Sequence, residues 1–332
     1  MLWKRVIKAE NIHKIPLLTR IKVNLKGFTA DQYVRFDFKN NDMNGYLSEL
    51  DRWKSRELNG PYNIIFDDKI LFYEVFSKHL SIPRNLAWVN NAQLYDLKGG
   101  TYSKEQLLFL LDMYKKLIVK PAYLGGSGKG VSLLSSEDGV YKINSESVSP
   151  EYITEYILNN NNTLICEYIM QHEYSNKLYD KTANTIRIIT IFNEEYTESR
   201  VLVAIQRIGT KETIPVDNAS KGALVSLIDL ETGVLGEAKT MFDSTSHRCH
   251  PNTGNRIAGI QVPFWQKVKD TLLHTHEKFP YIKLIAWDVM IHGDGFSVIE
   301  GNASTGFNIF QLWTGARDSE LGLFYKKNDI IK

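Results

Sequence analysis

The stretch from residue 118 to residue 131, with the sequence IVKPAYLGGSGKGV, constrains the fold of this chain more than any other. It begins as an apolar strand that carries Lys120, continues through a glycine-rich turn, and ends where a second strand begins. Glycines let backbone N–H groups approach a polyphosphate closely, and Lys120 and Lys129 add positive charge. The pattern indicates a hairpin whose turn binds a nucleotide phosphate. A hairpin without a ligand is the alternative.

A P-loop is a competing interpretation, because Gly128-Lys129 resembles the end of that motif. A P-loop requires Ser or Thr directly after the lysine, and a further glycine at a fixed distance before Gly128. The chain has Gly130 and Tyr123 at these two positions. The stretch is therefore not a P-loop.

A second group of polar residues lies near the end of the chain. Residues 286–291 and 296–300 are apolar strand patterns on either side of a short Gly-Asp-Gly turn. An antiparallel hairpin would place Asp288 near Glu300 and Asn302. These side chains offer oxygen ligands, which suit Mg²⁺. An ordinary hairpin with exposed acids is the alternative, but an unpaired carboxylate in an apolar strand is costly.

Hydrophobic periodicity and capping signals predict the remaining elements. Asp68 precedes an apolar helical pattern over residues 69–76, and helices are also expected over 106–114 and 263–277. Because strands and helices mix without strict alternation, we expect an α+β fold with antiparallel sheets. Strands are predicted over residues 118–122, 130–134, 163–167, 185–192, 200–207, 224–229, 285–291 and 296–300.

Composition limits the partners and the location of the protein. The chain has 332 residues, with 40 Lys and Arg against 38 Asp and Glu, and therefore a formal net charge of +2. This balance gives no global field that would attract nucleic acid or an anionic membrane, so any anion site must be local. No stretch is long and apolar enough to span a bilayer, and the first residues do not resemble a signal peptide. We expect a cytoplasmic protein.

The cysteine and histidine residues do not indicate a metal site. Cys166 and Cys249 are expected to be free thiols, with Cys166 buried in a strand. The His and Cys residues at 247–250 lack a fourth ligand at a fitting spacing, so we interpret them as a loop rather than a zinc site. His274 and His276 lie two residues apart on a predicted helix, and both are expected to be solvated.

The order of these motifs resembles the ATP-grasp superfamily over about residues 60 to 315. It runs from Asp68-Lys69, through Lys120 with its glycine loop, to the acidic residues near the end of the chain. The narrower likeness is to the sugar-transfer associated ATP-grasp family. It is carried by EYIMQH from residue 167, NTIR from 184, VDN from 216, HPNTG from 250, AWD from 286 and EGN from 300.

The resemblance implies an ATP-grasp fold, with two α+β subdomains whose antiparallel sheets clasp ATP, and a short N-terminal region before them. We expect residues 1–65 to form this partly helical N-terminal region and residues 66–115 to form linker helices. Residues 116–175 would then be the lid subdomain with the glycine-rich loop. Residues 176–332 would be the C-terminal subdomain with the Mg²⁺ site.

The resemblance also implies ATP and Mg²⁺ as cofactors, held by specific residues. Lys69 and Lys120 would contact the ATP phosphates, and the glycine loop would close over the phosphates. The segment from Glu167 to Ile169 would hydrogen-bond adenine. Glu173 would contact the ribose. The implied nucleotide-binding residues are Lys69, Lys120, Gly125, Gly126, Ser127, Gly128, Lys129, Glu167, Tyr168, Ile169 and Glu173, and the implied Mg²⁺ ligands are Asp288, Glu300 and Asn302.

Arginine residues are expected on the substrate side. Arg187 would face the phosphates or an anionic substrate, and Lys120 and Arg207 would be further catalytic residues. Amino-acid ligases of the superfamily commonly carry an arginine two positions before the metal-binding Asp, where this chain has Ala286. That role would fall to Arg187, to Arg207 or to backbone N–H groups near residues 304–306.

The activity implied by the resemblance is an ADP-forming ligase that joins a small-molecule carboxylate to an amine through an acyl phosphate. Its substrate would be a sugar or an amino acid in surface polysaccharide biosynthesis. Two alternatives stay open. A phosphotransferase would use the same ATP site to phosphorylate a hydroxyl group, and a non-catalytic nucleotide-binding protein would release no ADP.

Overall fold

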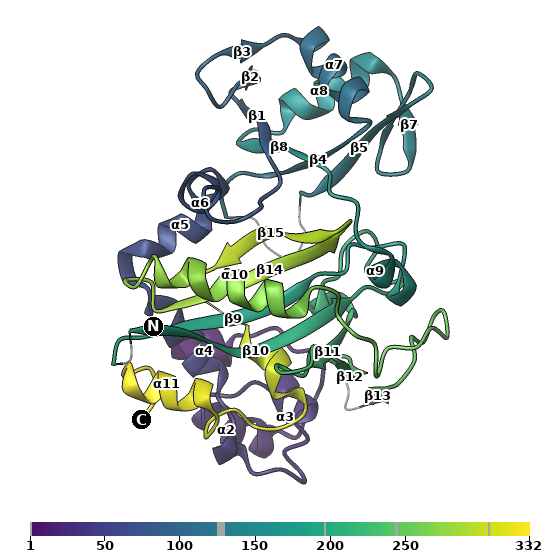
Figure 1. Cartoon of the computed structure of the whole chain (residues 1–332). Helices are drawn as coiled ribbons and strands as arrows, with labels where there is room; N and C mark the ends of the chain where they lie inside the picture. Colours follow the sequence, from purple (N-terminus) through teal and green to yellow (C-terminus); the bar gives the residue numbers. More distant parts are fainter. Residues whose placement is uncertain (1, 125–129, 196, 243–244, 305) are drawn as a thin grey trace. The chain divides into compact units, whose positions relative to one another are not determined.

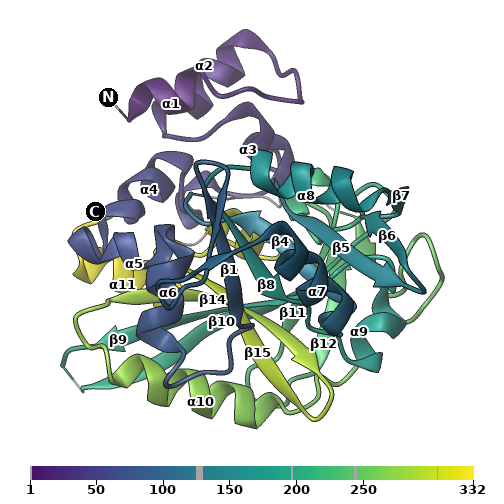
Figure 2. The same cartoon turned by 90° about the horizontal axis from the view of Figure 1, so that it is seen from above.

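A computed structural model describes residues 2–124, 130–195, 197–242, 245–304 and 306–332 (Figures 1 and 2). The glycine-rich turn lies outside these residues, and with it the expected phosphate contacts Gly125, Gly126, Ser127, Gly128 and Lys129. The chain divides into two compact units. Unit 1 comprises Met1–Asn63, Gln171–Phe296 and Gly301–Lys332, and unit 2 comprises Ile64–Met170 and Ser297–Glu300.

A seven-stranded sheet organises unit 1, and its paired strands run antiparallel in the order β13-β12-β11-β10-β9-β14-β15. Residues 297–300 of β15 are assigned to unit 2. The strands are β9 (Ile186–Asn193), β10 (Glu198–Ile208), β11 (Leu224–Ile228), β12 (Leu235–Lys239), β13 (Ser246–His247), β14 (Leu284–His292) and β15 (Gly295–Asn302).

Helices and short 3₁₀ turns surround this sheet. The N-terminal region contributes four helices, the middle of the chain contributes two, and the C-terminus contributes one. These are α1 (Trp3–Ile7), α2 (Leu17–Leu25), α3 (Ala30–Arg35), α4 (Glu49–Lys54), α9 (Glu173–Leu178), α10 (Trp265–Glu277) and α11 (Glu320–Lys327), with 3₁₀ turns at Met43–Gly45, Ser55–Glu57, Gly60–Asn63, Ala219–Lys221 and Phe307–Leu312.

The two faces of the unit 1 sheet have different cover. Helix α10 packs on β9 and β10 (Figure 1). The alternation of side chains along a strand turns Ile189 and Ala286 to the opposite face. There the N-terminal helices and the C-terminal segment complete the core, which includes Phe28, Phe36, Leu47, Ile189, Ile191, Ile205, Leu284, Ala286, Phe307, Phe310 and Tyr325. The N-terminal region is therefore part of the unit 1 core.

His276 corrects one expectation from the sequence. It was expected to be solvated, but it is fully buried where α10 packs on the sheet. Its ring is hydrogen-bonded to the hydroxyl of Thr190 at 2.7 Å and to the carbonyl of Ile282 at 2.7 Å. Burial lowers its pKa to about 4, so the ring is neutral. His274 is exposed, as expected.

Unit 2 is built on an eight-stranded antiparallel sheet in the order β3-β2-β1-β8-β4-β5-β6-β7. Two helices precede the first strand, and two more lie between strands. The elements are α5 (Ile64–Asp67), α6 (Lys69–Phe76), β1 (Asn85–Asn90), β2 (Gln93–Tyr95), β3 (Thr101–Tyr102), α7 (Lys104–Tyr114), β4 (Lys116–Pro121), β5 (Ser132–Glu137), β6 (Val140–Ile143), β7 (Glu146–Val148), α8 (Pro150–Asn159) and β8 (Thr163–Glu167).

The faces of the unit 2 sheet also differ. Apolar residues of α7 and α8, including Leu107 and Ile153, pack with Leu117, Val119 and Ile165 of the strands. Side chains one position away on the same strands point to the other face. That face carries a smaller apolar cluster of Ala122, Leu164 and Cys166, with Ile70, Trp88, Leu97 and Ile118 packed against it.

The expected α+β fold with antiparallel sheets is confirmed, and each predicted strand and helix has a counterpart within a few residues. Short strands β1 to β3, β6, β7, β12 and β13 and helices α8, α9 and α11 were not predicted. The division into four segments by role stays a prediction. Compactness instead groups residues 1–63 with unit 1 and residues 64–115 with unit 2. None of the described helices is long and apolar enough to cross a membrane.

Candidate active site

Lys69 stands at the first turn of α6, where Asp68 fixes the start of the helix. The carboxylate of Asp68 accepts hydrogen bonds from the backbone N–H groups of Ile70 at 2.8 Å and Leu71 at 3.0 Å. It therefore satisfies two donors that a helix start leaves unpaired. The Asp-Lys pair is thus a cap followed by a cation held in a fixed place.

Lys120 lies near the end of β4, and the backbone ties this end of the strand to the start of α6. The N–H of Lys69 donates to the carbonyl of Ala122 at 2.9 Å, and the N–H of Leu124 donates to the carbonyl of Asp67 at 2.9 Å. Asp68 and Tyr123 also form a β-bridge. Two lysines that are distant in sequence are therefore brought together within unit 2.

The two ammonium groups are half-buried, and neither has an ion pair or a hydrogen bond with another described residue. Burial lowers the pKa of Lys69, the carboxylate of Glu300 raises it, and the charge of Lys120 lowers it further. Glu300 is one of the predicted Mg²⁺ ligands. Unit 2 thus places two cations and one carboxylate in a single electrostatic site.

The apolar face of the sheet continues from this charged site. On β4, Lys120 follows Ile118 on the same face, and Ile118 pairs with Cys166 of β8. The thiol of Cys166 donates to the side-chain oxygen of Asn85 at 3.2 Å, and its pKa is raised by burial. Cys166 is a buried free thiol, as predicted. The amide nitrogen of Asn85 is buried without a hydrogen-bond partner among the described residues.

The predicted adenine-binding segment follows directly from β8. Glu167 ends this strand, and its carboxylate accepts hydrogen bonds from the backbone N–H and the side-chain Nε of Arg84, both at 3.3 Å. Burial raises the pKa of Tyr168, whose ring lies 5.5 Å from the ammonium of Lys116. Ile169 is half-buried. All three belong to unit 2, together with the two lysines.

Arg187 and Asp288 form the centre of a different polar network, in unit 1. They lie directly opposite each other on β9 and β14. Nε of Arg187 donates to Oδ1 of Asp288, and one of its terminal nitrogens donates to Oδ2 at 2.9 Å. The Asp288 side chain is 3% exposed and that of Arg187 is 11% exposed. This is a buried bidentate ion pair, and its two hydrogen bonds fix the orientation of both side chains.

Arg207 extends this network toward a second carboxylate. It donates to Oδ2 of Asp288 at 3.0 Å and lies 3.5 Å from Oδ1 of Asp217. It also donates to the hydroxyl of Thr185. Asp217 in turn accepts hydrogen bonds from the N–H of Thr185 at 2.6 Å and from its hydroxyl at 2.7 Å. Two guanidinium groups and two carboxylates therefore balance one another.

The remaining predicted residues of unit 1 lie apart from that network's centre. Asn302 on β15 donates to the carbonyl of Ala286 at 3.4 Å, two residues before Asp288. Glu173 begins α9, is largely exposed, and pairs with Lys177 at 2.8 Å. Among the described side chains, no group of three or more His, Cys, Asp or Glu residues could hold a metal ion. A Mg²⁺ site would therefore have to include an amide oxygen, water or phosphate.

The structure adds residues that sequence reasoning did not single out. Asp217 belongs to the VDN motif, but its link to Arg207 and Thr185 depends on pairing between distant strands. Asn85 begins β1 and carries no motif. His250, which was expected only as a loop residue, is buried; its ring is hydrogen-bonded to the carbonyl of Gly209 at 2.8 Å and stacks on Tyr179.

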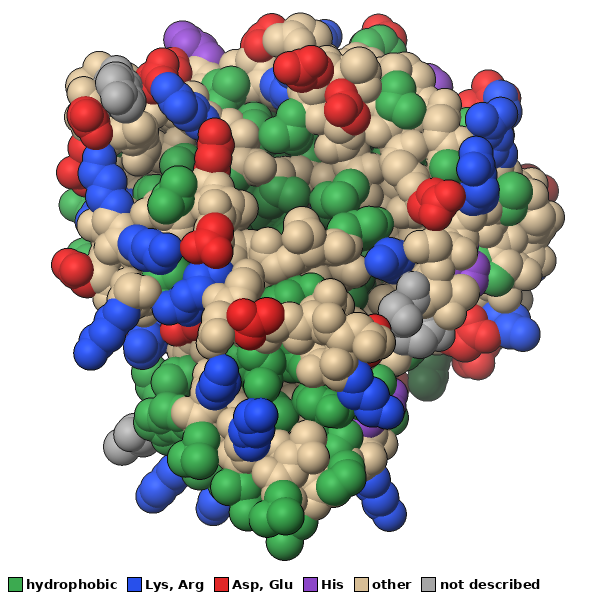
Figure 3. All heavy atoms as spheres, turned by 90° about the horizontal axis from the view of Figure 1, so that it is seen from below, with side chains coloured by type: hydrophobic (Ala, Val, Ile, Leu, Met, Phe, Trp, Pro, Cys, Tyr) green, Lys and Arg blue, Asp and Glu red, His purple; other side chains and the backbone are tan. Residues whose placement is uncertain are grey.

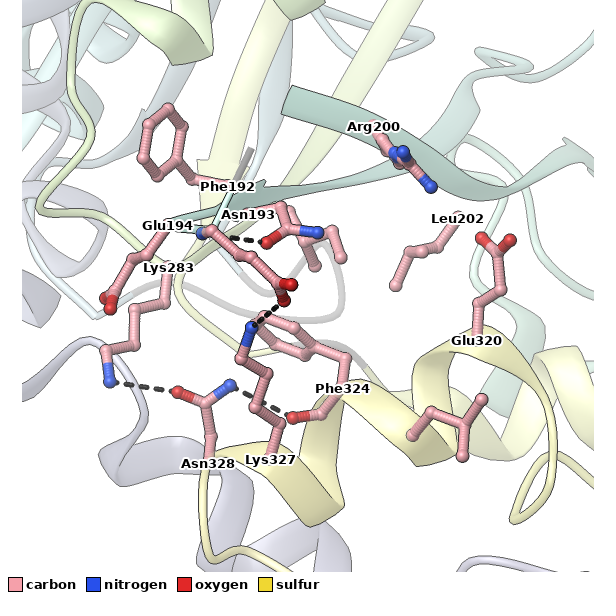
Figure 4. Close-up of a pocket in the computed structure, with 13 residues that line it drawn as sticks. Phe192, Asn193, Glu194, Arg200, Leu202, Lys283, Glu320, Phe324, Lys327 and Asn328 are labelled. Carbon is pink, nitrogen blue, oxygen red and sulfur yellow. Dashed lines mark hydrogen bonds and ion pairs between the residues drawn. The ribbon is translucent and has the colours of Figure 1, made fainter. Parts of the chain in front are cut away.

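A groove of about 380 Å³ elsewhere in unit 1 contains none of the predicted site residues (Figure 4). It is lined by the ends of β9 and β10 and by α11. Both of its lysines have partners: Lys327 lies 3.2 Å from the carboxylate of Glu195, and Lys283 donates to the side-chain oxygen of Asn328 at 2.9 Å. The groove therefore gives no reason to move the candidate site.

Comparison with solved structures finds ATP-grasp ligases at low identity. The ATP-grasp ligase PsnB complexed with minimal precursor is 16% identical, with 75% of this chain and 56% of that chain covered and a TM-score of 0.38. The ADP complex of purK, N5-carboxyaminoimidazole ribonucleotide synthetase, is 13% identical, with coverages of 73% and 46% and a TM-score of 0.41. D-alanine--D-alanine ligase from Bacillus anthracis is 15% identical, with coverages of 80% and 63% and a TM-score of 0.36. The chain spans less than two thirds of each.

A curated relative matches only a short part of the chain. The large subunit of exodeoxyribonuclease 7 from Mesorhizobium japonicum is 30% identical over 106 residues, which are 31% of this chain and 20% of that protein. A match of this extent does not assign a function.

The family comparison covers most of the sequence. A model described as sugar-transfer associated ATP-grasp matches residues 52–321. This range includes both sheets, the two lysines and the Arg187–Asp288 pair. The chain belongs to the sugar-transfer associated ATP-grasp family and has the α+β fold of the ATP-grasp superfamily.

Proposed function

We propose that the chain is an ATP- and Mg²⁺-dependent ligase that joins a carboxylate to an amine through an acyl phosphate and releases ADP. Its substrate would be a sugar or an amino acid of surface polysaccharide biosynthesis, and the reaction would take place in the cytoplasm. Membership of the ATP-grasp superfamily supports the use of ATP. The substrate class rests on the family alone.

The observation that carries the proposal is the lysine pair of unit 2. Lys69 and Lys120 are half-buried neighbours that form no ion pair with a described residue, and the carboxylate of Glu300 is the main negative charge acting on Lys69. Two like charges that are partly removed from water repel each other, and an anion bound between them relieves the repulsion. A triphosphate supplies that negative charge. The apolar cluster around Cys166 and the amide nitrogen of Asn85, which has no hydrogen-bond partner among the described residues, then suit the base of a nucleotide.

The predicted Mg²⁺ ligands also suit their metal. Asp288, Glu300 and Asn302 would hold it with oxygen atoms only, which is the chemistry that Mg²⁺ prefers. Asp288 is held in one orientation by Arg187 and Arg207, so it presents a preorganised carboxylate. When bound, the metal would neutralise charge on the phosphates.

The proposed chemistry balances in two steps. An oxygen of the substrate carboxylate attacks the γ-phosphorus of ATP, the bond to the bridging oxygen breaks, and ADP leaves. The amine then attacks the acyl carbon of the acyl phosphate, phosphate leaves, and the nitrogen loses a proton. Lys69 and Lys120 would hold the phosphates in line for the first step.

Arg187 is proposed to fill the role that Ala286 cannot. In related amino-acid ligases the arginine precedes the metal-binding Asp on the same strand, whereas here Arg187 stands directly opposite Asp288 on the neighbouring strand. Its guanidinium group therefore contacts the carboxylate of Asp288. We propose that Arg187, assisted by Arg207, stabilises the negative charge that develops on the substrate in the second step.

A screen of paired acids and amines for ADP release tests the proposal. For any acid that supports ADP release, addition of hydroxylamine in place of the amine should yield a hydroxamate, because hydroxylamine traps an acyl phosphate. A stable phosphate ester without hydroxamate would show a phosphotransferase instead. Binding of ATP without ADP release, across acids that include uronic acids and amino acids, would contradict the ligase proposal.

A further inference from the structure

The first 26 residues present an unusually apolar surface to solvent. In α1, Trp3 is 42% exposed and Ile7 is 54% exposed, and Ile12 after this helix is 72% exposed. In α2, Leu17 is 71%, Leu18 81%, Ile21 48% and Leu25 74% exposed. Such large side chains are usually buried, and a cluster of them on the surface indicates a binding site.

Most of the apolar side chains of helix α2 face away from the core of unit 1. Only Val23 is buried against that core. At about 100° per residue, Leu17, Leu18, Ile21 and Leu25 fall within one arc of roughly 100°, away from Val23. Lys22 and Lys26 follow on one side of this arc, and Arg20 lies on the other. The helix therefore shows a leucine-rich stripe with basic borders.

The charge of this segment differs from that of the rest of the chain. Residues 1–26 contain seven Lys and Arg and one Glu, whereas the remainder contains 33 Lys and Arg and 37 Asp and Glu. Lys4, Lys8, Lys14 and Lys22 have no ion pair among the described residues. Figure 3 shows hydrophobic side chains gathered over these N-terminal helices, with Lys and Arg side chains around them. The nearly neutral net charge of the whole chain hides this local concentration.

We propose that α1 and α2 form a docking surface for an anionic lipid membrane. The leucine-rich stripe of α2 would enter the boundary between head groups and acyl chains, and the surrounding lysines would contact anionic head groups. Trp3 suits the same boundary, because tryptophan concentrates at membrane interfaces. The protein would lie on the surface and would not span the bilayer.

Charge decides between a membrane and a protein partner. The cores of protein interfaces are depleted of lysine, whereas lysine is common on helices that lie on anionic membranes. Here lysines border the stripe and arginine takes part only at Arg5 and Arg20. Arg5 is already placed over the ring of Trp53 at 4.0 Å, and Arg20 lies 3.5 Å from the carbonyl of Ile7. The lysines are left to face the membrane.

Co-sedimentation of the full chain with vesicles tests this proposal. The protein should bind vesicles that contain phosphatidylglycerol, bind phosphatidylcholine vesicles at least about tenfold more weakly, and be released by added salt. Equal binding to both vesicles, or no binding to either, would contradict the proposal. Neither outcome depends on the catalytic proposal, because no substrate is present.

Two pairs of variants test the basic residues and the leucine-rich stripe separately. Lys14→Glu with Lys22→Glu should reduce binding to anionic vesicles at least about tenfold, while Lys104→Glu with Lys267→Glu, at exposed positions on α7 and α10, should leave it nearly unchanged. Leu18→Ser with Leu25→Ser should also reduce binding, whereas Phe109→Ser, at a 66% exposed position of α7, should not.

A second copy of this chain is the rival occupant of the stripe. Sedimentation velocity without lipid distinguishes it: the proposal predicts the same oligomeric state for the wild type and for the Leu18→Ser, Leu25→Ser variant. A dimer that the leucine substitutions dissociate would overturn the proposal. Circular dichroism should show an unchanged fold in each variant, since none of the seven substituted residues is buried.

Discussion

The charged site residues are balanced by opposite charges in unit 1 but only partly balanced in unit 2. In unit 1, Arg187 and Arg207 are matched by Asp288 and Asp217, and each guanidinium group donates to at least one carboxylate or hydroxyl within the unit. In unit 2, Lys69 stands beside Lys120, and its pKa is lowered by burial and by that second cation. One set of charges is balanced inside the fold, and the other is left with excess positive charge.

This difference separates two kinds of contribution to a site. Balanced buried charges hold one another in place, and removing one member leaves its partners uncompensated. Like charges that are only partly offset weaken the unit slightly, but they create a place that an anion can fill. We therefore expect substitutions in unit 1 to act first on stability, and substitutions in unit 2 to act first on ligand binding and turnover.

The largest effect on stability is expected for Asp288→Asn. The change leaves Arg187 and Arg207 partly uncompensated at a buried position, and it should lower the free energy of unfolding by about 3–5 kcal/mol. Urea unfolding measures this loss. Asp294→Asn, in the exposed turn between β14 and β15, is the matched control and should change stability by less than about 0.5 kcal/mol. Equal effects of the two changes would show that the network is not structural.

Glu300→Gln is expected to act on turnover instead. Loss of the carboxylate weakens the proposed Mg²⁺ site, and the rate of ADP formation should fall at least about 100-fold, or roughly 2.7 kcal/mol of activation free energy. The unfolding midpoint should stay close to that of the wild type. Glu146→Gln, at an exposed position of β7, provides the control. Unchanged turnover in Glu300→Gln would remove this residue from the proposed site.

His276 extends the comparison to pH. Burial lowers its pKa in the folded chain to about 4, below the ordinary value of 6.5. The unfolded state therefore binds the proton first as pH falls below 6.5, and stability is lost down to about pH 4. Between pH 7 and pH 5 this group should cost about 2 kcal/mol of unfolding free energy. Urea midpoints at both pH values should differ less in His276→Gln, while His274→Gln should behave as the wild type.

The smallest of these effects is expected for Lys120→Ala. It removes one half-buried ammonium from the proposed phosphate site, which should weaken binding of a Mg-nucleotide by about 1.5 kcal/mol, or roughly tenfold. Thermal unfolding with and without the nucleotide measures this as a smaller stabilisation. Lys104→Ala, at an exposed site on α7, should retain the full stabilisation. If both variants are stabilised equally, Lys120 does not contact the nucleotide.

The sequence predicted the local parts of this fold well. Asp68 as a helix cap, β8 over residues 163–167 and the buried Cys166 follow from short-range patterns, and the structure confirms each of them. The register between strands that are distant in sequence could not be predicted from such patterns. That Arg187 would stand opposite Asp288 depends on the pairing of β9 with β14, which no local pattern specifies.

The burial of individual side chains is the second property that could not be predicted from the sequence. His276 and His274 have similar neighbours on α10, but only His276 turns toward the sheet and finds Thr190 as a partner. The N-terminal region shows the converse. Its apolar residues would ordinarily be assigned to a core, yet Leu18 and Leu25 are exposed, because the core of unit 1 takes Val23 from the opposite side of α2.

The titration of Lys69 is the most direct test of the contrast between the units. Nuclear magnetic resonance of the lysine side chains, with Lys69→Arg to assign the signal, can follow its pKa in the free protein and with a non-hydrolysable Mg-ATP analogue. We expect a pKa below 10.5 in the free protein and a rise on binding, as the triphosphate balances the charges of Lys69 and Lys120. A pKa that does not change when the nucleotide binds would contradict the proposed role of this lysine pair.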